Sequence, residues 1–198
     1  MNRYEIRIAG FGGQGVITLS KMIAHAGAIH EDLIVSQTEA YSAAARGGKC
    51  WAEVVVDLDK EEKLIDYPKA LEPYDFVIVL SQAAAEEIKA PMLKQGPKTG
   101  FVIWDNKLIE KFKAAQKLKA LGLPLQELAV EQFGSGVFGN AILFGAFTKI
   151  AGIFSEEAAK KTLENFVPKG ALAKNLEAFD LGVAKGEEFL NSLPEASA

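Results

Sequence analysis

The sequence predicts an α/β protein: a Rossmann-like three-layer domain with a mostly parallel sheet and a helical C-terminal part. Three observations predict this class. A short alternating strand at residues 3–9 runs into a glycine-rich turn, and an apolar helix-forming segment follows that turn. Residues 75–81 and 101–104 are almost entirely apolar, which is typical of strands covered on both faces. The last third of the chain has helical periodicity and no comparable strand.

The first half of the chain is expected to alternate strands and helices. A helix over residues 14–28 leads to a second strand at 32–36, and these complete a βαβ unit with the first strand. Residues 37–48 are rich in small and polar side chains and end in a glycine pair, so we expect a structured loop there. The β-branched run at residues 50–58 predicts a further strand.

The second half is expected to be mainly helical. The hydroxyl of Ser81 can accept from the free N–H groups of a helix that ends near Lys89. Residues 140–150 are apolar with helical period, and Ser155 precedes a helix with acids in its first turn. One apolar face predicts the final helix, through Leu172, Leu176, Phe179 and Val183.

Composition and charge exclude several classes of function. A chain of 198 residues is long enough for one domain with a full core, which we expect to span residues 1–198. The net charge of −4 argues against a nucleic-acid partner. We expect a cytoplasmic protein without a membrane partner, because no signal-peptide pattern or bilayer-length apolar run is present. The single cysteine, Cys50, excludes an internal disulfide and a cysteine-only iron–sulfur site.

The glycine-rich turn is the first candidate site. Gly10, Gly12 and Gly15 have the G-x-G-x-x-G spacing, which lets a backbone approach an anion and directs a helix N-terminus at it. The same spacing also occurs where a tight strand-to-helix turn needs only close packing. A dinucleotide would require an acid at the end of the second strand for the ribose hydroxyls. That strand ends at Ser36 and Gln37, which disfavours NAD.

Arg46, Gly47 and Gly48 form a second candidate site. A guanidinium beside two glycines can hold a carboxylate or phosphate in a bidentate manner. An ordinary surface ion pair before a strand would have the same pattern. His25 and His30 lack a metal-ligand partner at suitable spacing and are interpreted as surface or helix-end residues.

Two further residues have structural interpretations. Cys50 is expected to be a buried small hydrophobe, and Ser135 to lie in a turn. The chain therefore carries a candidate ligand site and no self-sufficient catalytic set.

These motifs together resemble one known family. The glycine turn with Gly13 and Gln14, followed by a Tyr-Ser-x-x-x-Arg-Gly-Gly segment at residues 41–48, is similar to the γ subunit of 2-oxoacid:ferredoxin oxidoreductases. The resemblance continues through Asn140 and the Leu-Phe-Gly-Ala run at 143–146, and ends with the Asn-x-x-Ala-Phe-x-x-Gly pattern at 175–182. It covers most of the chain in the order of the family.

The resemblance implies a subunit that is inactive alone. Members of the family oxidatively decarboxylate a 2-oxoacid, such as 2-oxoglutarate, pyruvate or a branched-chain oxoacid, to an acyl-CoA and reduce ferredoxin. Thiamine diphosphate, Mg and iron–sulfur clusters would then belong to partner subunits: α and β (thiamine-binding) subunits and a ferredoxin-like subunit. Coenzyme A would be a co-substrate. An exposed apolar docking face would also favour a homodimer of the isolated chain.

The resemblance places no catalytic or metal-binding residue in this chain. It implies a ligand or interface loop at the C-terminal edge of the sheet, made of Gly10, Gly12, Gly13, Gln14, Gly15, Tyr41, Ser42, Arg46, Gly47, Gly48 and Asn140. The alternatives are a free-standing nucleotide- or dinucleotide-binding Rossmann protein and a scaffold with a vestigial site.

Overall fold

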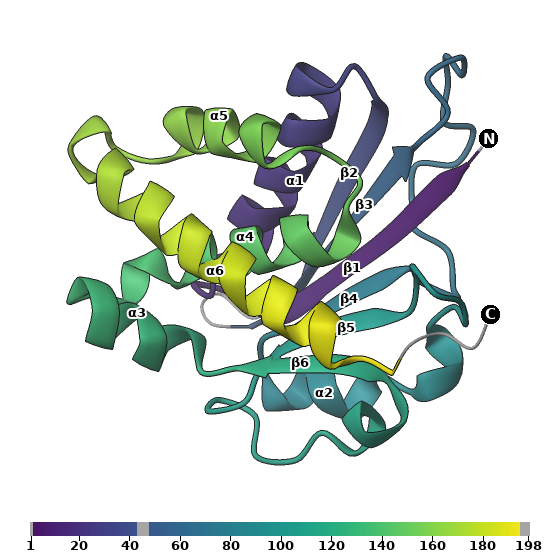
Figure 1. Cartoon of the computed structure of the whole chain (residues 1–198). Coiled ribbons are helices and arrows are strands. Elements are labelled where there is room, and N and C mark those ends of the chain that lie inside the picture. Colours follow the sequence, from purple (N-terminus) through teal and green to yellow (C-terminus); the bar gives the residue numbers. More distant parts are fainter. Residues whose placement is uncertain (1, 43–47, 195–198) are drawn as a thin grey trace.

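One sheet of six strands organises the protein, in the order β2-β3-β1-β4-β5-β6. A computed structural model describes residues 2–42 and 48–194 (Figure 1). Parallel pairing joins β1 to β4, β4 to β5 and β5 to β6, whereas β3 is antiparallel to both β1 and β2. The predicted mostly parallel sheet is therefore confirmed. The strands are β1 (Arg3–Phe11), β2 (Ile34–Tyr41), β3 (Lys49–Asp57), β4 (Phe76–Val79), β5 (Phe101–Asp105) and β6 (Lys119–Leu123).

Helices cover both faces of this sheet, which gives the predicted three layers. α1, α4 and α6 pack on one face together with α5, and α2 lies on the opposite face (Figure 1). The chain after β6 is helical, as the sequence predicts. The helices are α1 (Val16–His30), α2 (Gln82–Glu87), α3 (Leu125–Phe133), α4 (Gly139–Ala151), α5 (Glu156–Phe166) and α6 (Leu172–Ser192), with short 3₁₀ turns η1 (Ala90–Met92), η2 (Lys113–Lys117), η3 (Gly136–Phe138) and η4 (Lys169–Ala171).

The alternation of side chains along the strands divides the apolar core between the two faces. In β1, Ile6 and Ile8 point to the α1 side and are fully buried. Val77 and Val79 of β4 belong to the second cluster, on the α2 side, with Ala85 of α2. Because β1 and β4 are buried on both sides, their carboxyl ends are held rigidly, and the loops that follow them are positioned by a fixed scaffold.

The second strand differs from the sequence prediction. A strand at residues 32–36 with a loop at 37–48 is wrong, because β2 continues to Tyr41 and pairs with β3 along its whole length. β3 also lies between β1 and β2, so the expected βαβ unit joins two strands that run in the same direction but are not neighbours. The polar side chains of Gln37 and Glu39 are compatible with a strand because β2 is at the edge of the sheet, where they bond to Ser20 and Lys21 of α1.

The other predicted boundaries agree with the structure to within a few residues. Ser81 accepts a hydrogen bond from the Ala84 N–H at 3.2 Å and caps α2, and Ser155 caps α5 through the Ala158 N–H at 3.1 Å. Between residues 105 and 134, where no element is predicted from the sequence, the structure has β6 and α3.

The predicted apolar face of α6 is only partly the buried one. Of the apolar side chains, Phe179 is fully buried. Phe179 contacts Phe144 of α4, with ring centroids 5.7 Å apart. Glycines bring the two backbones together: a Cβ on Gly182 would overlap the carbonyl oxygen of Ile142, and a Cβ on Gly145 would overlap that of Phe179. The two helices therefore approach each other at backbone distance, which fixes α4 and its N-terminus against the rest of the fold.

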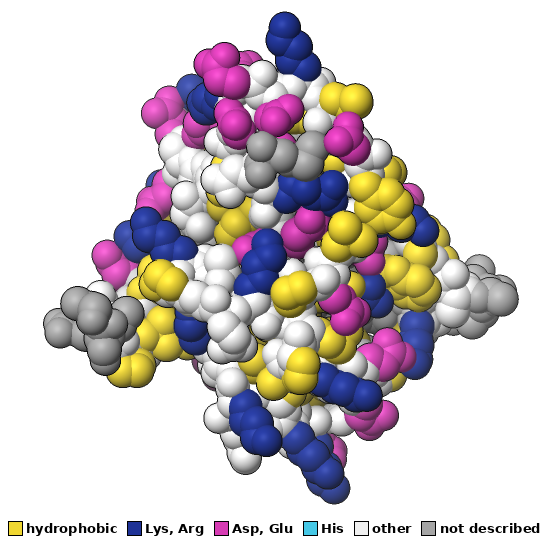
Figure 2. All heavy atoms as spheres, turned by 90° about the vertical axis from the view of Figure 1, so that its right-hand side faces the viewer, with side chains coloured by type: hydrophobic (Ala, Val, Ile, Leu, Met, Phe, Trp, Pro, Cys, Tyr) yellow, Lys and Arg dark blue, Asp and Glu magenta, His cyan; other side chains and the backbone are white. Residues whose placement is uncertain are grey.

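The surface away from the glycine turn is mixed in character. Figure 2 shows the face that carries the amino end of β1, where acidic and basic side chains are interspersed and hydrophobic ones are scattered between them. Within residues 2–42 and 48–194, no helix has the length and apolar character needed to cross a bilayer.

Candidate functional site

The glycine turn joins β1 to α1 with two residues in the left-handed region. Gly13 has φ +95° and Gly15 has φ +77°, left-handed backbone conformations in which a residue with a side chain would be strained. Gly10 is required for a different reason, because a Cβ there would lie 2.7 Å from the side-chain oxygen of Gln14 and 3.1 Å from the side chain of Leu80. The three glycines therefore allow a tight turn that brings the carboxyl end of β4 close to the carboxyl end of β1.

Gln14 holds this turn together. Its Oε1 accepts a hydrogen bond from the Phe11 N–H at 2.6 Å, and its Nε2 donates to the Leu80 carbonyl at 2.7 Å. Because both ends of the amide are bonded to main-chain groups, Gln14 links the carboxyl ends of β1 and β4. Its polar side chain, unusual in a pyrophosphate fingerprint, therefore has a structural partner.

The hairpin between β2 and β3 lies beside the glycine turn. The Gly12 N–H donates to the Gly48 carbonyl at 3.0 Å, and the Ser42 N–H donates to the Lys49 carbonyl at 2.8 Å. Tyr41 pairs with Cys50, and its side chain is exposed. The structure thus brings the two predicted loops together at one edge of the sheet.

Arg46 and Gly47, the other two residues of the predicted Arg-Gly-Gly motif, lie outside the described residues. Gly48, the last residue of that motif, is bonded to the glycine turn.

Asn140 is the third predicted element of the site, and the structure places it against the glycine turn. It lies in the first turn of α4, and its side chain fills the space beside Gly15, the N-cap of α1. A Cβ on Gly15 would overlap the Asn140 side chain. Residues 125 positions apart in the chain thus meet at one point.

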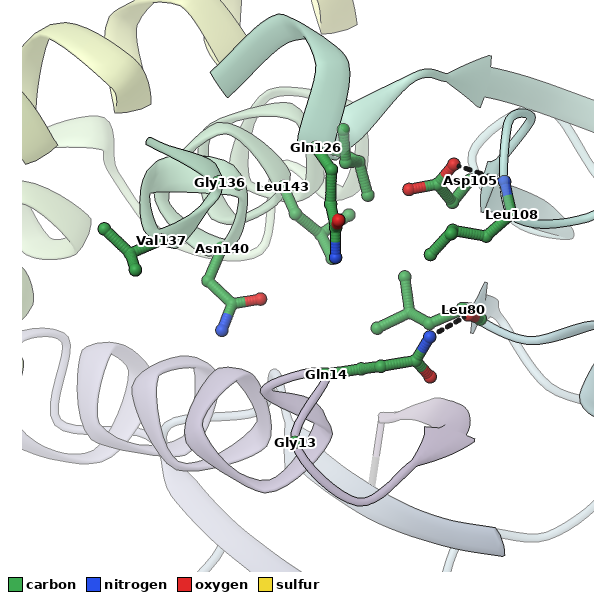
Figure 3. A pocket seen from close by; sticks show the side chains of 12 residues that line it. Gly13, Gln14, Leu80, Asp105, Leu108, Gln126, Gly136, Val137, Asn140 and Leu143 are labelled. Carbon is green, nitrogen blue, oxygen red and sulfur yellow. Dashed lines mark hydrogen bonds between the residues drawn. The ribbon is translucent and has the colours of Figure 1, made fainter. Parts of the chain in front are cut away.

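A small pocket opens between these elements, with a volume of about 120 Å³ (Figure 3). Its polar side chains are Asp105, Gln126 and Asn140, together with Gln14. Among the described residues that line it, none is a lysine or arginine. The volume is much smaller than a dinucleotide site requires. The full lining is Gly13, Gln14, Leu80, Asp105, Leu108, Leu125, Gln126, Gly136, Val137, Gly139, Asn140 and Leu143.

Asp105 is the pocket residue that the sequence analysis missed. It ends β5 and is 1% exposed, and its Oδ1 accepts from the N–H groups of Lys107 at 2.9 Å and Leu108 at 3.0 Å. Figure 3 shows the carboxylate beside the pocket, across from Asn140 and Gln126. An acid directly after a buried parallel strand is a signal that could have identified it.

The polar side chains of this pocket are suited to hydrogen bonding. One carboxylate and three side-chain amides can accept or donate hydrogen bonds, but the described lining includes no cysteine, serine or histidine that could act as a nucleophile or base. Phosphate recognition by side chains of this lining is disfavoured, because Asp105 is negative and no cation of the lining offsets it.

The remaining titratable candidates lie elsewhere. His25 and Thr162 contact each other at 3.2 Å between α1 and α5, where burial and the neighbouring His30 lower the pKa of His25. Cys50 is buried in β3, as expected, and burial raises the pKa of its thiol. In the described part of the chain, no group of three or more His, Cys, Asp or Glu side chains is arranged to hold a metal ion.

Comparisons with known proteins identify the family of this chain. Residues 5–185 match the family model described as pyruvate ferredoxin/flavodoxin oxidoreductase. The chain is 38% identical to the 2-oxoglutarate synthase subunit KorC of Methanothermobacter thermautotrophicus, over 91% of this chain and 93% of the relative. It is 34% identical to the KorC subunit of Methanocaldococcus jannaschii, over 94% and 95% of the two chains.

Solved structures give the same result. The γ subunit of a keto/oxoacid ferredoxin oxidoreductase from Geobacter sulfurreducens aligns with a TM-score of 0.77 at 27% identity, over 93% of this chain and 99% of that one. The 2-oxoglutarate:ferredoxin oxidoreductase of Magnetococcus marinus, with 2-oxoglutarate, coenzyme A and succinyl-CoA bound, aligns with a TM-score of 0.78 at 26% identity, over 99% of this chain and 32% of that one. The chain belongs to the pyruvate ferredoxin/flavodoxin oxidoreductase family.

Proposed function

We propose that this chain is the γ subunit of a 2-oxoglutarate:ferredoxin oxidoreductase. The enzyme would decarboxylate 2-oxoglutarate, transfer the resulting acyl group to the thiol of coenzyme A, and pass the released electrons to ferredoxin. The observation that carries this proposal is the end-to-end match to chains named 2-oxoglutarate synthase subunit KorC. A ketoisovalerate oxidoreductase subunit is less similar, at 31% identity over 71% of this chain.

The fold supports a role in an assembly rather than in isolated catalysis. Thiamine diphosphate with its metal and the iron–sulfur clusters would bind to other subunits. An iron–sulfur cluster needs several cysteine thiolates, and the single cysteine of this chain is buried in β3. Those cofactors would be held by α- and β-type thiamine-binding subunits and a ferredoxin-like subunit. This chain would contact the thiamine-binding subunits and help to shape the site that coenzyme A approaches. The reaction steps would occur on the partner subunits.

The candidate site would form one wall of a boundary between subunits. Its pocket is small, and two apolar side chains at its mouth are exposed: Val137 at 76% and Leu108 at 43%. A partner subunit that covers the pocket would bury these two apolar side chains. We therefore propose that the glycine turn, the 41–48 segment and Asn140 lie at the boundary with the thiamine-binding subunits.

Arg46 would be the cation of this boundary. The guanidinium beside Gly47 and Gly48 suits the phosphates of coenzyme A or a carboxylate of a partner subunit. Replacing Arg46 with alanine should weaken coenzyme A binding or subunit cohesion in the assembled enzyme. An enzyme with Arg46→Ala that keeps both the KM for coenzyme A and its subunit composition would disprove this role.

Copurification, followed by an activity assay with and without this chain, tests the proposal as a whole. The chain is purified from its native cell with its partners, and reduction of ferredoxin is measured with 2-oxoglutarate and coenzyme A. We expect partners with thiamine diphosphate and iron–sulfur absorbance, and loss of the reaction when this chain is omitted. Full activity without the chain would contradict the proposal. A homogeneous chain that binds NAD(H) without partners would instead support a free-standing dinucleotide-binding protein.

A further inference from the structure

A larger groove lies on the α2 side of the sheet, away from the glycine turn. Its volume is about 740 Å³, and it runs between the segment from α2 to η1 and the segment from residue 111 into η2. The buried side chains of Ala85 and Ile88 contribute to its lining, with Pro91 and Ala114 beside them. The groove therefore offers an apolar floor on the outside of a fold whose core is already complete.

The charge around this floor is strongly one-sided. Four exposed lysines line the groove, and Glu86 is its single acid. None of the four has a carboxylate of the described residues within ion-pair distance, although nearby lysines do: Lys49 bonds to Glu87 at 2.6 Å and Lys107 to Glu127 at 2.9 Å. The chain as a whole has a net charge of −4, so this is a local excess of positive charge. The lysines are Lys89, Lys111, Lys113 and Lys117.

The two walls of the groove are bonded to each other. Gln82 of α2 donates from Nε2 to the Lys111 carbonyl at 3.0 Å, and its Oε1 accepts from the N–H groups of Glu110 at 3.1 Å and Lys111 at 3.2 Å. These three bonds hold the lysine-bearing segment beside α2 before any ligand is present. The groove is thus preformed, which lowers the entropic cost of binding.

The groove is also continuous with the candidate functional site. A shallow hollow lined by Gln82, Glu86, Leu108, Glu110 and Lys111 lies between them. It shares Leu108 with the pocket at the glycine turn, and it shares Gln82, Glu86 and Lys111 with the groove. A partner that covers the mouth of the pocket at Leu108 is therefore positioned to extend into the groove.

From these observations we infer that the groove binds an acidic segment of a companion subunit, with its carboxylates on the four lysines and its apolar side chains on the floor. This inference rests on the proposed function, since it requires a partner subunit. A protein segment fits better than a small anion, because the lining combines four lysines with the apolar side chains of Ala85, Ile88 and Pro91, and a small anion would use the lysines alone. Mutual repulsion of the unpaired ammonium groups in the free chain would be relieved on binding.

Lysine footprinting of the native complex tests the inference. The free chain and the purified complex are treated with an amine-acetylating reagent, and each lysine is quantified by mass spectrometry. Carbodiimide coupling, which joins lysines directly to carboxylates, then identifies the residues in contact. We expect the four groove lysines to react about tenfold more slowly in the complex and to couple to Asp or Glu of a partner. Lys63, Lys69, Lys98 and Lys169, which are also exposed, are the internal control.

Charge-neutralised variants give the functional measurement. Replacing all four groove lysines with glutamine should weaken association with the partner by roughly tenfold or more, with a reduced salt dependence. The same replacement at the four control lysines should change neither the affinity for the partner nor its salt dependence. Circular dichroism establishes that both variants are folded.

The outcomes separate this inference from the proposed function. A complex that assembles with its groove lysines fully reactive would overturn the inference alone. A chain that assembles with no partner would overturn both. Protection of the free chain's lysines by inorganic pyrophosphate, without protection in the complex, would identify a small-anion site and also overturn the inference.

Discussion

The side-chain amide of Gln14 donates to the main-chain carbonyl of Leu80 at 2.7 Å, and so ties the glycine turn to the end of β4. The other end of the same amide accepts from the Phe11 N–H. A glutamate at this position keeps the acceptor but replaces the donor with a second negative oxygen that faces a carbonyl. Replacing Gln14 with glutamate therefore tests the hydrogen bond to Leu80, because the two side chains have nearly the same size and differ in the donor.

We predict that Gln14→Glu lowers the free energy of unfolding by about 1–3 kcal/mol at neutral pH, the range for a lost hydrogen bond that leaves a polar group unsatisfied. Near pH 4 the deficit should shrink, because a protonated carboxyl can again donate to Leu80. Denaturant unfolding of both proteins at the two pH values measures this. A deficit that does not change with pH would refute the bridging role of the amide.

Gly15 and Asn140 are predicted to be energetically coupled. Gly15→Ala combines left-handed strain of about 1–2 kcal/mol with overlap on the Asn140 side chain, whereas Gly13→Ala has the strain but meets no atom within 4 Å. Gly15→Ala should therefore be the more destabilising of the two. Adding Asn140→Ala should reduce its cost to about that of Gly13→Ala. A double-mutant cycle gives the coupling, and strictly additive effects would exclude the contact.

The α4–α6 contact predicts a graded glycine series. Gly182→Ala gains about 0.5–1 kcal/mol of helix propensity but loses more by overlap with the Ile142 carbonyl, so a net loss of about 1–3 kcal/mol is expected. Gly186→Ala should cost less, because the nearest atom to its Cβ would be the Lys149 Cβ at 2.9 Å, which is a much milder overlap than the one with the Ile142 carbonyl. Gly170→Ala, which meets nothing within 4 Å, should be neutral or slightly stabilising. Thermal unfolding ranks the three variants, and equal effects would contradict the contact.

The α1–α5 contact is predicted to weaken at acid pH. Burial lowers the pKa of His25 below its unfolded value of about 6.5, so the neutral imidazole is favoured in the folded state. Its contribution to stability is therefore present above the unfolded pKa and lost as the pH falls through the lowered folded value. His25→Gln should remove this part of the pH dependence. Unfolding free energies between about pH 7.5 and 5 test it, since carboxylate effects cancel between the two proteins. Identical slopes would refute the prediction.

The strongly apolar elements were predictable from the sequence because their patterns are set by burial on both sides. β1, β4 and β5 and the helices α1 and α4 were all expected, with boundaries displaced by a few residues. β6 was missed because Lys119–Leu123 has no β-branched residue and its strand character comes from pairing with β5. β2 was cut short because its polar residues read as a loop, whereas the neighbouring β3 supplies their pairing.

The sequence motifs of the candidate site were predictable, but the contacts between them in space were not. The glycine spacing and Asn140 were identified separately, but no local signal indicates that one packs on the other over such a distance in sequence. Asp105 was overlooked because the strand before it is short and its acid resembles an ordinary loop residue. The lysine groove could not be anticipated, since its walls come from two segments that only the fold brings together.

The position of β1 in the middle of the sheet has a consequence for how the protein is made. β1 leaves the ribosome before both of its hydrogen-bonding neighbours, β3 and β4. Its glycine turn then needs Leu80 to close it and Asn140 to complete it. A nascent chain that stops short of α4 therefore contains the whole G-x-G-x-x-G sequence but not the site, which comes into existence only when most of the chain has been translated.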